Sequence, residues 1–163
     1  MKSLIRTLLL AAAVLPLSAF AQTLHVPLSG YQEVAALSSP GSGMFRAFVD
    51  RRAGVIRYAL SYRDTGSEVT QAHIHLGQKG VNGGVMVFLC SNLGNSATAP
   101  PCPAAPGIVT GTLAAGDVVG PAGQGVAAGD FEQLLEAIRH GVAYVNIHTT
   151  AYPGGELRGQ TRR

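Results

Sequence analysis

Apolar and polar residues alternate along several short segments of this chain, with turn-forming residues between them. In the segment 55–63, apolar residues occupy every second position and Arg57, Ser61 and Arg63 point the other way. A period of two indicates a half-buried β-strand, because successive side chains of a strand point to opposite faces. The same pattern predicts strands over 24–28, 44–50, 55–63, 69–76, 84–90, 108–114, 142–149 and 156–161. The short connection 51–54 predicts a hairpin.

One segment has the period of a helix instead. Apolar residues stand at positions 131, 134, 135 and 138, Asp130 is a good N-cap residue and Gly141 is a good terminator. We expect a short amphipathic helix docked on the sheet, after an irregular loop at 116–129. Many short strands with glycine-rich turns predict an all-β fold. The expected architecture is a Greek-key β-sandwich or barrel, immunoglobulin-like or superoxide-dismutase-like, with one short α-helix.

The first 21 residues have the pattern of a secretory signal peptide. Lys2 and Arg6 give a basic start, residues 8–17 are mainly apolar, and Ala19-Phe20-Ala21 has the small-x-small form of a cleavage site. The apolar run is shorter than the roughly 20 residues that span a bilayer. We therefore expect a signal peptide at 1–21 and one exported domain at 22–163, periplasmic or secreted, with no transmembrane segment after cleavage.

The exported part of the chain is close to neutral. Because two of the basic residues lie in the leader, its removal lowers the formal charge from +3 to +1. No stripe of lysine or arginine remains that could neutralise phosphates, so the sequence argues against a nucleic-acid partner.

The chain contains two cysteines, Cys90 and Cys102. In an oxidising compartment an even pair usually forms a disulfide. A thiolate metal site or a redox pair is the alternative, but neither Cys-x-x-Cys spacing nor a nearby histidine supports it. We expect a structural disulfide that stabilises the fold by about 3 kcal/mol in the chain-entropy model.

Polar functional groups lie inside two of the predicted strands. His73 and His75 share one strand face by the alternation rule, and Asn146 and His148 share a face of another strand. If the two strands are neighbours, three imidazoles converge. A Pro-Gly-Gly turn then folds the last predicted strand back beside the strand that carries His148.

The last predicted strand adds a carboxylate and a guanidinium, Glu156 and Arg158, which share a face and suggest an ion pair. Two interpretations remain open. In one, the histidines join Asn146, Glu156 and Arg158 in a hydrogen-bonded structural network. In the other, His73, His75 and His148 bind one copper or zinc ion, which could be redox active.

Enzyme chemistry finds less support in the sequence. No serine stands in a Gly-x-Ser-x-Gly elbow, and the histidines have no evident nucleophile beside them. Glycines at 77, 80, 83 and 84 are explained by turn geometry, because no helix follows that could hold a phosphate. The sequence favours a non-enzymatic binding or structural module whose partner is a protein, a small molecule or a metal.

Three motifs resemble those of the CHRD domain, the module named after chordin. They are Leu28-Ser29-Gly30-x-x-Glu33-Val34, Ala72-His73-Ile74-His75-x-Gly77, and the long segment from Gly141 to Gln160 that contains Tyr144-Val145-Asn146-Ile147-His148-Thr149 and Pro153-Gly154-Gly155-Glu156-Leu157-Arg158. The resemblance covers about Thr23 to Thr161. It implies an extracellular or periplasmic all-β domain, free-standing in bacteria and repeated in chordins. In chordin, growth-factor capture is assigned to other modules, so that activity is not implied here.

Overall fold

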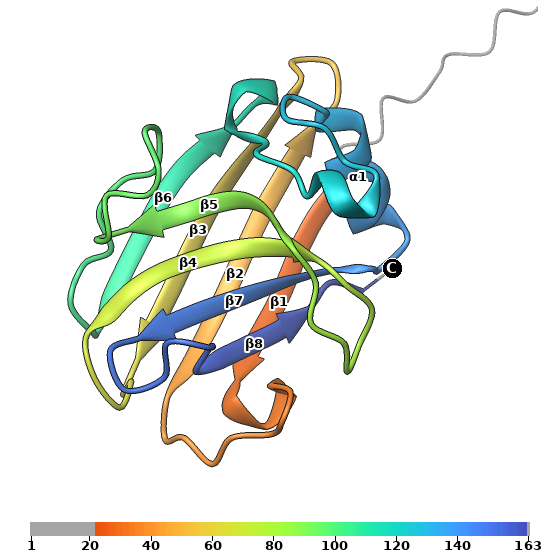
Figure 1. The fold of residues 1–163 in the computed structure, drawn as a ribbon. Coiled ribbons are helices and arrows are strands. Elements are labelled where there is room, and N and C mark those ends of the chain that lie inside the picture. Colours follow the sequence, from red (N-terminus) through yellow and green to blue (C-terminus); the bar gives the residue numbers. More distant parts are fainter. Residues whose placement is uncertain (1–21, 163) are drawn as a thin grey trace, which may run out of the picture.

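Eight antiparallel strands form one continuous sheet that curls into a nearly closed barrel (Figure 1). The structure is a computed structural model and describes residues 22–162. The strands are β1 (Gln22–Ser29), β2 (Ser42–Asp50), β3 (Val55–Arg63), β4 (Val69–Leu76), β5 (Val85–Ser91), β6 (Gly107–Leu113), β7 (Ala143–Thr149) and β8 (Leu157–Gln160). Their order is β5-β4-β7-β8-β1-β2-β3-β6. The expected signal peptide, residues 1–21, lies outside the described residues.

The alternation in the sequence corresponds to the inside and outside of the barrel. In β3, Ile56, Tyr58 and Leu60 are buried in the core, whereas Arg57 and Arg63 are exposed. The hairpin predicted at 51–54 joins β2 to β3, which pair along their full length. The all-β prediction is confirmed, and a barrel describes the sheet better than a sandwich.

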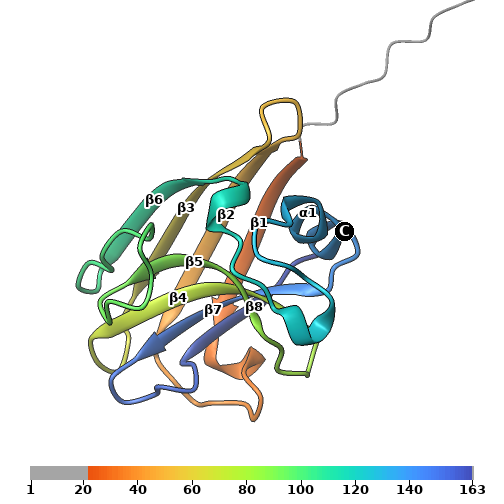
Figure 2. The ribbon, with the colours of Figure 1, turned by 45° about the horizontal axis from the view of Figure 1, so that its top comes forward.

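The predicted helix is present as α1 (Phe131–Arg139). The Asp130 carboxylate caps it by accepting a hydrogen bond of 3.3 Å from the backbone N–H of Gln133. Leu134, Leu135 and Ile138 are buried against the barrel. Figures 1 and 2 both place α1 close to the C-terminus. The loop expected before it contains two short 3-10 helices, Ala115–Asp117 and Ala122–Gln124, and a third spans Gly30–Gln32.

Strand β7 is buried on both of its faces. Val145 and Ile147 belong to the hydrophobic core. The alternate residues Tyr144, Asn146 and His148 point away from that core but are also buried, because loops cover this side of the sheet. Polar groups enclosed in this way need hydrogen-bond partners within the protein.

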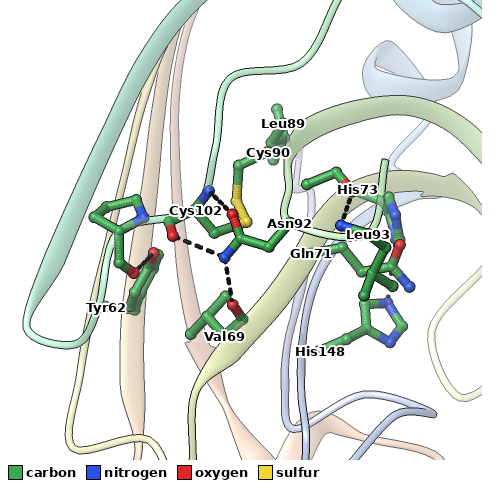
Figure 3. Close-up of a disulfide and its surroundings, with 12 residues drawn as sticks. Tyr62, Val69, Gln71, His73, Leu89, Cys90, Asn92, Leu93, Cys102 and His148 are labelled. Carbon is green, nitrogen blue, oxygen red and sulfur yellow. Dashed lines mark hydrogen bonds between the residues drawn. A yellow bond between two sulfur atoms is a disulfide. The ribbon is translucent and has the colours of Figure 1, made fainter. Parts of the chain in front are cut away.

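The predicted disulfide joins Cys90 at the end of β5 to Cys102 in the following loop. Next to it, the Asn92 amide donates to the backbone carbonyls of Val69 (3.0 Å) and Cys102 (2.9 Å) and accepts from the Cys102 N–H (Figure 3). The disulfide and this asparagine fix an irregular loop to the sheet. The alternative of a thiolate metal site was wrong.

Substitutions in α1 should separate packing from capping. Leu134→Ala is expected to lower the free energy of unfolding by about 2–5 kcal/mol, because it leaves a cavity against the barrel. Asp130→Ala should cost about 1 kcal/mol, the typical value for a lost N-cap. The exposed residue Gln133 provides the control, since Gln133→Ala should change stability by less than about 0.5 kcal/mol. Urea denaturation measures all three, and equal losses at positions 133 and 134 would contradict the docking of α1.

The disulfide can be tested by chemistry and by stability. The unfolded, unreduced protein should contain no thiol that reacts with Ellman's reagent. The double variant Cys90→Ala/Cys102→Ala should lose about 3 kcal/mol of stability and keep its β-sheet circular dichroism. Two free thiols, or an unchanged denaturation midpoint, would show that the bridge does not stabilise the protein.

Candidate three-histidine site

The pairing of β4 with β7 brings the histidines together. In this antiparallel register His73 lies opposite Asn146, His75 opposite Tyr144 and His148 opposite Gln71. One ring nitrogen from each of the three histidines lies within 4.8 Å of the others. All three side chains are buried. His73 and His148 appear at the right of Figure 3. The predicted convergence of His73, His75 and His148 is therefore confirmed.

Hydrogen bonds define the tautomer of each ring. His75 Nδ1 lies 3.0 Å from the carbonyl oxygen of Gly83, and His148 Nδ1 lies 2.9 Å from that of Pro153. A carbonyl oxygen can only accept, so both Nδ1 atoms carry the proton and both Nε2 atoms carry a lone pair. His73 Nδ1 then donates to His148 Nε2, at 3.2 Å. Its own Nε2 is left with a lone pair as well.

Two of these lone pairs are buried without a donor. Among the described residues, neither His73 Nε2 nor His75 Nε2 has a hydrogen-bond partner. An unsatisfied buried polar atom typically costs about 1–3 kcal/mol, so proteins rarely contain one without a reason. A ligand that accepts electron pairs would satisfy both atoms.

The surroundings keep the three rings neutral. Burial lowers the pKa of His73 to about 3, helped by the neighbouring rings of His148 and His75. Burial also lowers the pKa of His75 to about 4, although the bond to Gly83 opposes this shift. The pKa of His148 is lowered by burial too, against the effect of its bond to Pro153. Neutral imidazole is the form that binds metals.

Aromatic rings enclose two sides of the cluster. The ring of Phe88 meets His73 edge to face, with centroids 4.6 Å apart. Tyr144 stacks on His75 at 4.7 Å and an interplanar angle of 6°. The guanidinium carbon of Arg158 lies 3.5 Å from the centroid of the Tyr144 ring. The three side chains of Arg158, Tyr144 and His75 thus form one stack.

Arg158 also anchors the loop at residues 77–84. It donates to the Asn82 side chain (2.9 Å) and to the carbonyls of Gln78 (3.2 Å) and Val81 (2.8 Å). Gly83 in this loop has no room for a Cβ, which would collide with the backbone of Leu76. The glycine-rich segment is therefore more than a turn, because it carries the carbonyl that orients His75.

Asn146 connects the site to a residue that sequence analysis missed. Its side-chain N–H groups donate to the Glu33 carboxylate (2.6 Å) and to the carbonyl of Leu157 (3.0 Å). Burial raises the pKa of Glu33, while Asn146 and the positive charge of Arg158 oppose that shift. The only signal for Glu33 in the sequence was its place in the 28–34 motif.

The expected ion pair between Glu156 and Arg158 was wrong. Glu156 is fully buried and instead accepts hydrogen bonds from Ser39 (2.6 Å), the Gly66 N–H (2.7 Å) and Thr149 (2.7 Å). It precedes β8, which begins at Leu157, so its carboxylate joins the loops around it. In place of the expected single network, Glu156 has partners of its own, whereas Asn146 and Arg158 both interact with Glu33. The histidines bond to neither Glu156 nor Arg158.

The comparisons with known proteins agree with this fold and motif arrangement. The family model described as "CHRD domain" matches residues 24–161, which include the histidines and all eight strands except the first two residues of β1. The chain belongs to the CHRD domain family. No curated protein and no solved structure matched it. The disulfide fits the extracellular location that is usual for CHRD domains. Among residues 22–162, no helix has both the length and the apolar character needed to cross a membrane.

The depressed histidine pKa values predict that the metal-free protein loses stability in mild acid. Unfolded histidines take up protons near pH 6.5, whereas His73 and His75 stay neutral in the folded protein down to about pH 3 and 4. The unfolded chain therefore binds more protons between these limits, and stability falls as the pH falls. Each such histidine contributes up to about 1.4 kcal/mol per pH unit.

Urea denaturation between pH 7 and pH 5 in the presence of a chelator measures this slope. His73→Gln should reduce the slope, and His25→Gln, on the exposed face of β1, should leave it unchanged. Equal slopes in the wild type and in His73→Gln would contradict the assignment.

Proposed function

We propose that this protein is an exported CHRD domain that binds one copper or zinc ion through His73, His75 and His148. The two buried Nε2 lone pairs without a donor carry this proposal, since they belong to a cluster in which one ring nitrogen of each histidine lies within 4.8 Å of the others. A metal ion about 2.0–2.1 Å from one nitrogen of each ring would satisfy both lone pairs. His148 Nε2 would then bind the metal in place of the hydrogen bond from His73 Nδ1.

The chemistry of the donors supports the choice of metal. Imidazole suits copper and zinc, whereas calcium and magnesium prefer oxygen ligands. Metal-binding histidines usually donate their second ring nitrogen to a carbonyl or carboxylate. His75 and His148 already do so, to Gly83 and Pro153. These two hydrogen bonds orient the rings and lower the cost of assembling the site.

Two further observations support the proposal that the protein is exported. The leader at 1–21 has the order of basic, apolar and small residues found in signal peptides. The disulfide is of a kind that persists in oxidising compartments. We infer a periplasmic or secreted protein that meets metal ions outside the cytoplasm. Its function is binding, with no protein partner needed to complete the three-ligand set.

A purely structural role for the histidines is the competing function. The hydrogen bond between His73 and His148 favours it. That role requires no metal, and it leaves the lone pairs on His73 and His75 unexplained.

Metal content decides between the two functions. We expect the protein, purified without an affinity tag, stripped with a chelator and dialysed against copper or zinc, to retain about one ion per chain by plasma mass spectrometry. Binding to the folded state should raise the thermal midpoint in proportion to the logarithm of free metal concentration. His75→Gln and His148→Gln should each weaken metal binding by more than about 100-fold. This exceeds the effect usual for residues that only hydrogen-bond to a metal ligand.

The control variant is His25→Gln. His25 is exposed on β1 and is not part of the three-histidine group, so its replacement should not affect binding. Cooperative unfolding of each metal-free variant must be verified first. If wild type and His75→Gln retain the same amount of metal, or if neither retains any, the histidines serve structure alone.

A further inference from the structure

The charges around the three histidines restrict which ion they can hold. The group of potential ligands consists of His73, His75 and His148 alone, so no carboxylate or thiolate reaches the metal position from the described residues. Glu156 is held by its three other partners. An ion bound here would receive lone pairs but no negative charge from its ligands.

A buried positive charge lies next to one of these ligands. Arg158 is 1% exposed and its guanidinium lies against the Tyr144 ring, which stacks in turn on His75. Arginine stays charged in proteins. Glu33 is the carboxylate that attracts Arg158, and even when it is ionised the two charges sum to zero. The surroundings of the site are therefore neutral or positive.

Burying an ion in such surroundings depends strongly on its charge. In the Born description the desolvation cost rises with the square of the charge, so a divalent ion costs about four times as much as a monovalent ion of equal size. Repulsion by Arg158 adds a further penalty for each unit of charge. Both effects favour a monovalent ion.

The number of ligands points the same way. Zn(II) in proteins completes four ligands, with a water where the protein supplies three. His73, His75 and His148 are 3%, 7% and 7% exposed, which leaves little access for that water. Cu(I) is stable with three ligands and binds imidazole nitrogen.

We propose that the site selects Cu(I) over Zn(II) and Cu(II), with Arg158, acting through Tyr144, as the residue that disfavours a divalent ion. This inference rests on the proposed metal-binding function. It adds the oxidation state of the ion and assigns Arg158 a positioning and electrostatic role that a loop anchor alone would not have.

Competition titrations test the selectivity. Cu(I) affinity is measured without oxygen, in ascorbate, against bathocuproine disulfonate. Zn(II) affinity is measured against a chromophoric zinc indicator, and Cu(II) by direct titration without reductant. Cu(I) is expected to bind one per chain and at least about 100-fold more tightly than either divalent ion, two decades on the affinity scale. A thiol assay confirms that the disulfide stays closed in ascorbate.

Variants at position 158 separate charge from loop anchoring. Arg158→Gln should lower the ratio of Cu(I) to Zn(II) affinity about tenfold or more, the effect of one unit charge at this range in a partly screened interior. Arg158→Lys keeps the charge but not the planar set of hydrogen bonds, so its ratio should stay close to that of the wild type. Arg46→Gln removes an exposed charge on β2 and should leave the ratio unchanged.

Each outcome separates this inference from the proposed function. Binding of Zn(II) or Cu(II) as tight as that of Cu(I) overturns the selectivity but leaves metal binding intact. If Arg158→Gln and Arg158→Lys lower the ratio of Cu(I) to Zn(II) affinity equally, or if Arg158→Gln leaves it unchanged, the electrostatic role of Arg158 is overturned. Failure to bind any of the three ions overturns the metal-binding function itself.

Discussion

The antiparallel register of β4 on β7 is the constraint on which the rest of the site depends. It places His73 opposite Asn146 and His75 opposite Tyr144. Diagonal neighbours across two strands are about 7–8 Å apart, within reach of large rings, so His73 can bond to His148. A slip of β7 by one residue would turn Tyr144, Asn146 and His148 to the core face and away from the histidines of β4. The apolar residues of both strands, which fill the barrel, therefore also fix the geometry of the polar cluster.

Loops on the outer face of the sheet convert this cluster into an enclosed site. The loop 77–84 supplies the carbonyl that orients His75, and the turn after β7 supplies the one that orients His148. Arg158 holds the first of these loops in place and at the same time stacks on Tyr144. Arg158 therefore both fixes the loop 77–84 and places a positive charge near the histidines. The desolvation that results keeps the rings neutral and available as ligands.

Periodicity predicted the strands and the helix because burial on one face leaves a regular trace in the sequence. The alternation rule predicted which strand face carries each histidine, and the Pro-Gly-Gly turn predicted that the last strand pairs with the strand of His148. The pairing of β4 with β7, which brings the three histidines together, was a hypothesis that periodicity could not decide. Periodicity did not predict the contacts that loops make. Loops cover the polar face of β7, which the alternation could not show, and Glu156 bonds to Ser39 and Gly66 rather than to Arg158. Glu33 reaches Asn146 across 113 residues, a contact that no local pattern encodes.

Three imidazoles on one face of the barrel are proposed to hold a single metal ion. X-ray absorption spectroscopy of the copper-loaded, reduced protein tests it most directly, because it reports the number and type of ligands around the metal itself. We expect about three nitrogen neighbours near 2.0 Å with the multiple scattering typical of imidazole. A sulfur neighbour, a shell of oxygen ligands without imidazole scattering, or the same spectrum from the His75→Gln variant would contradict it.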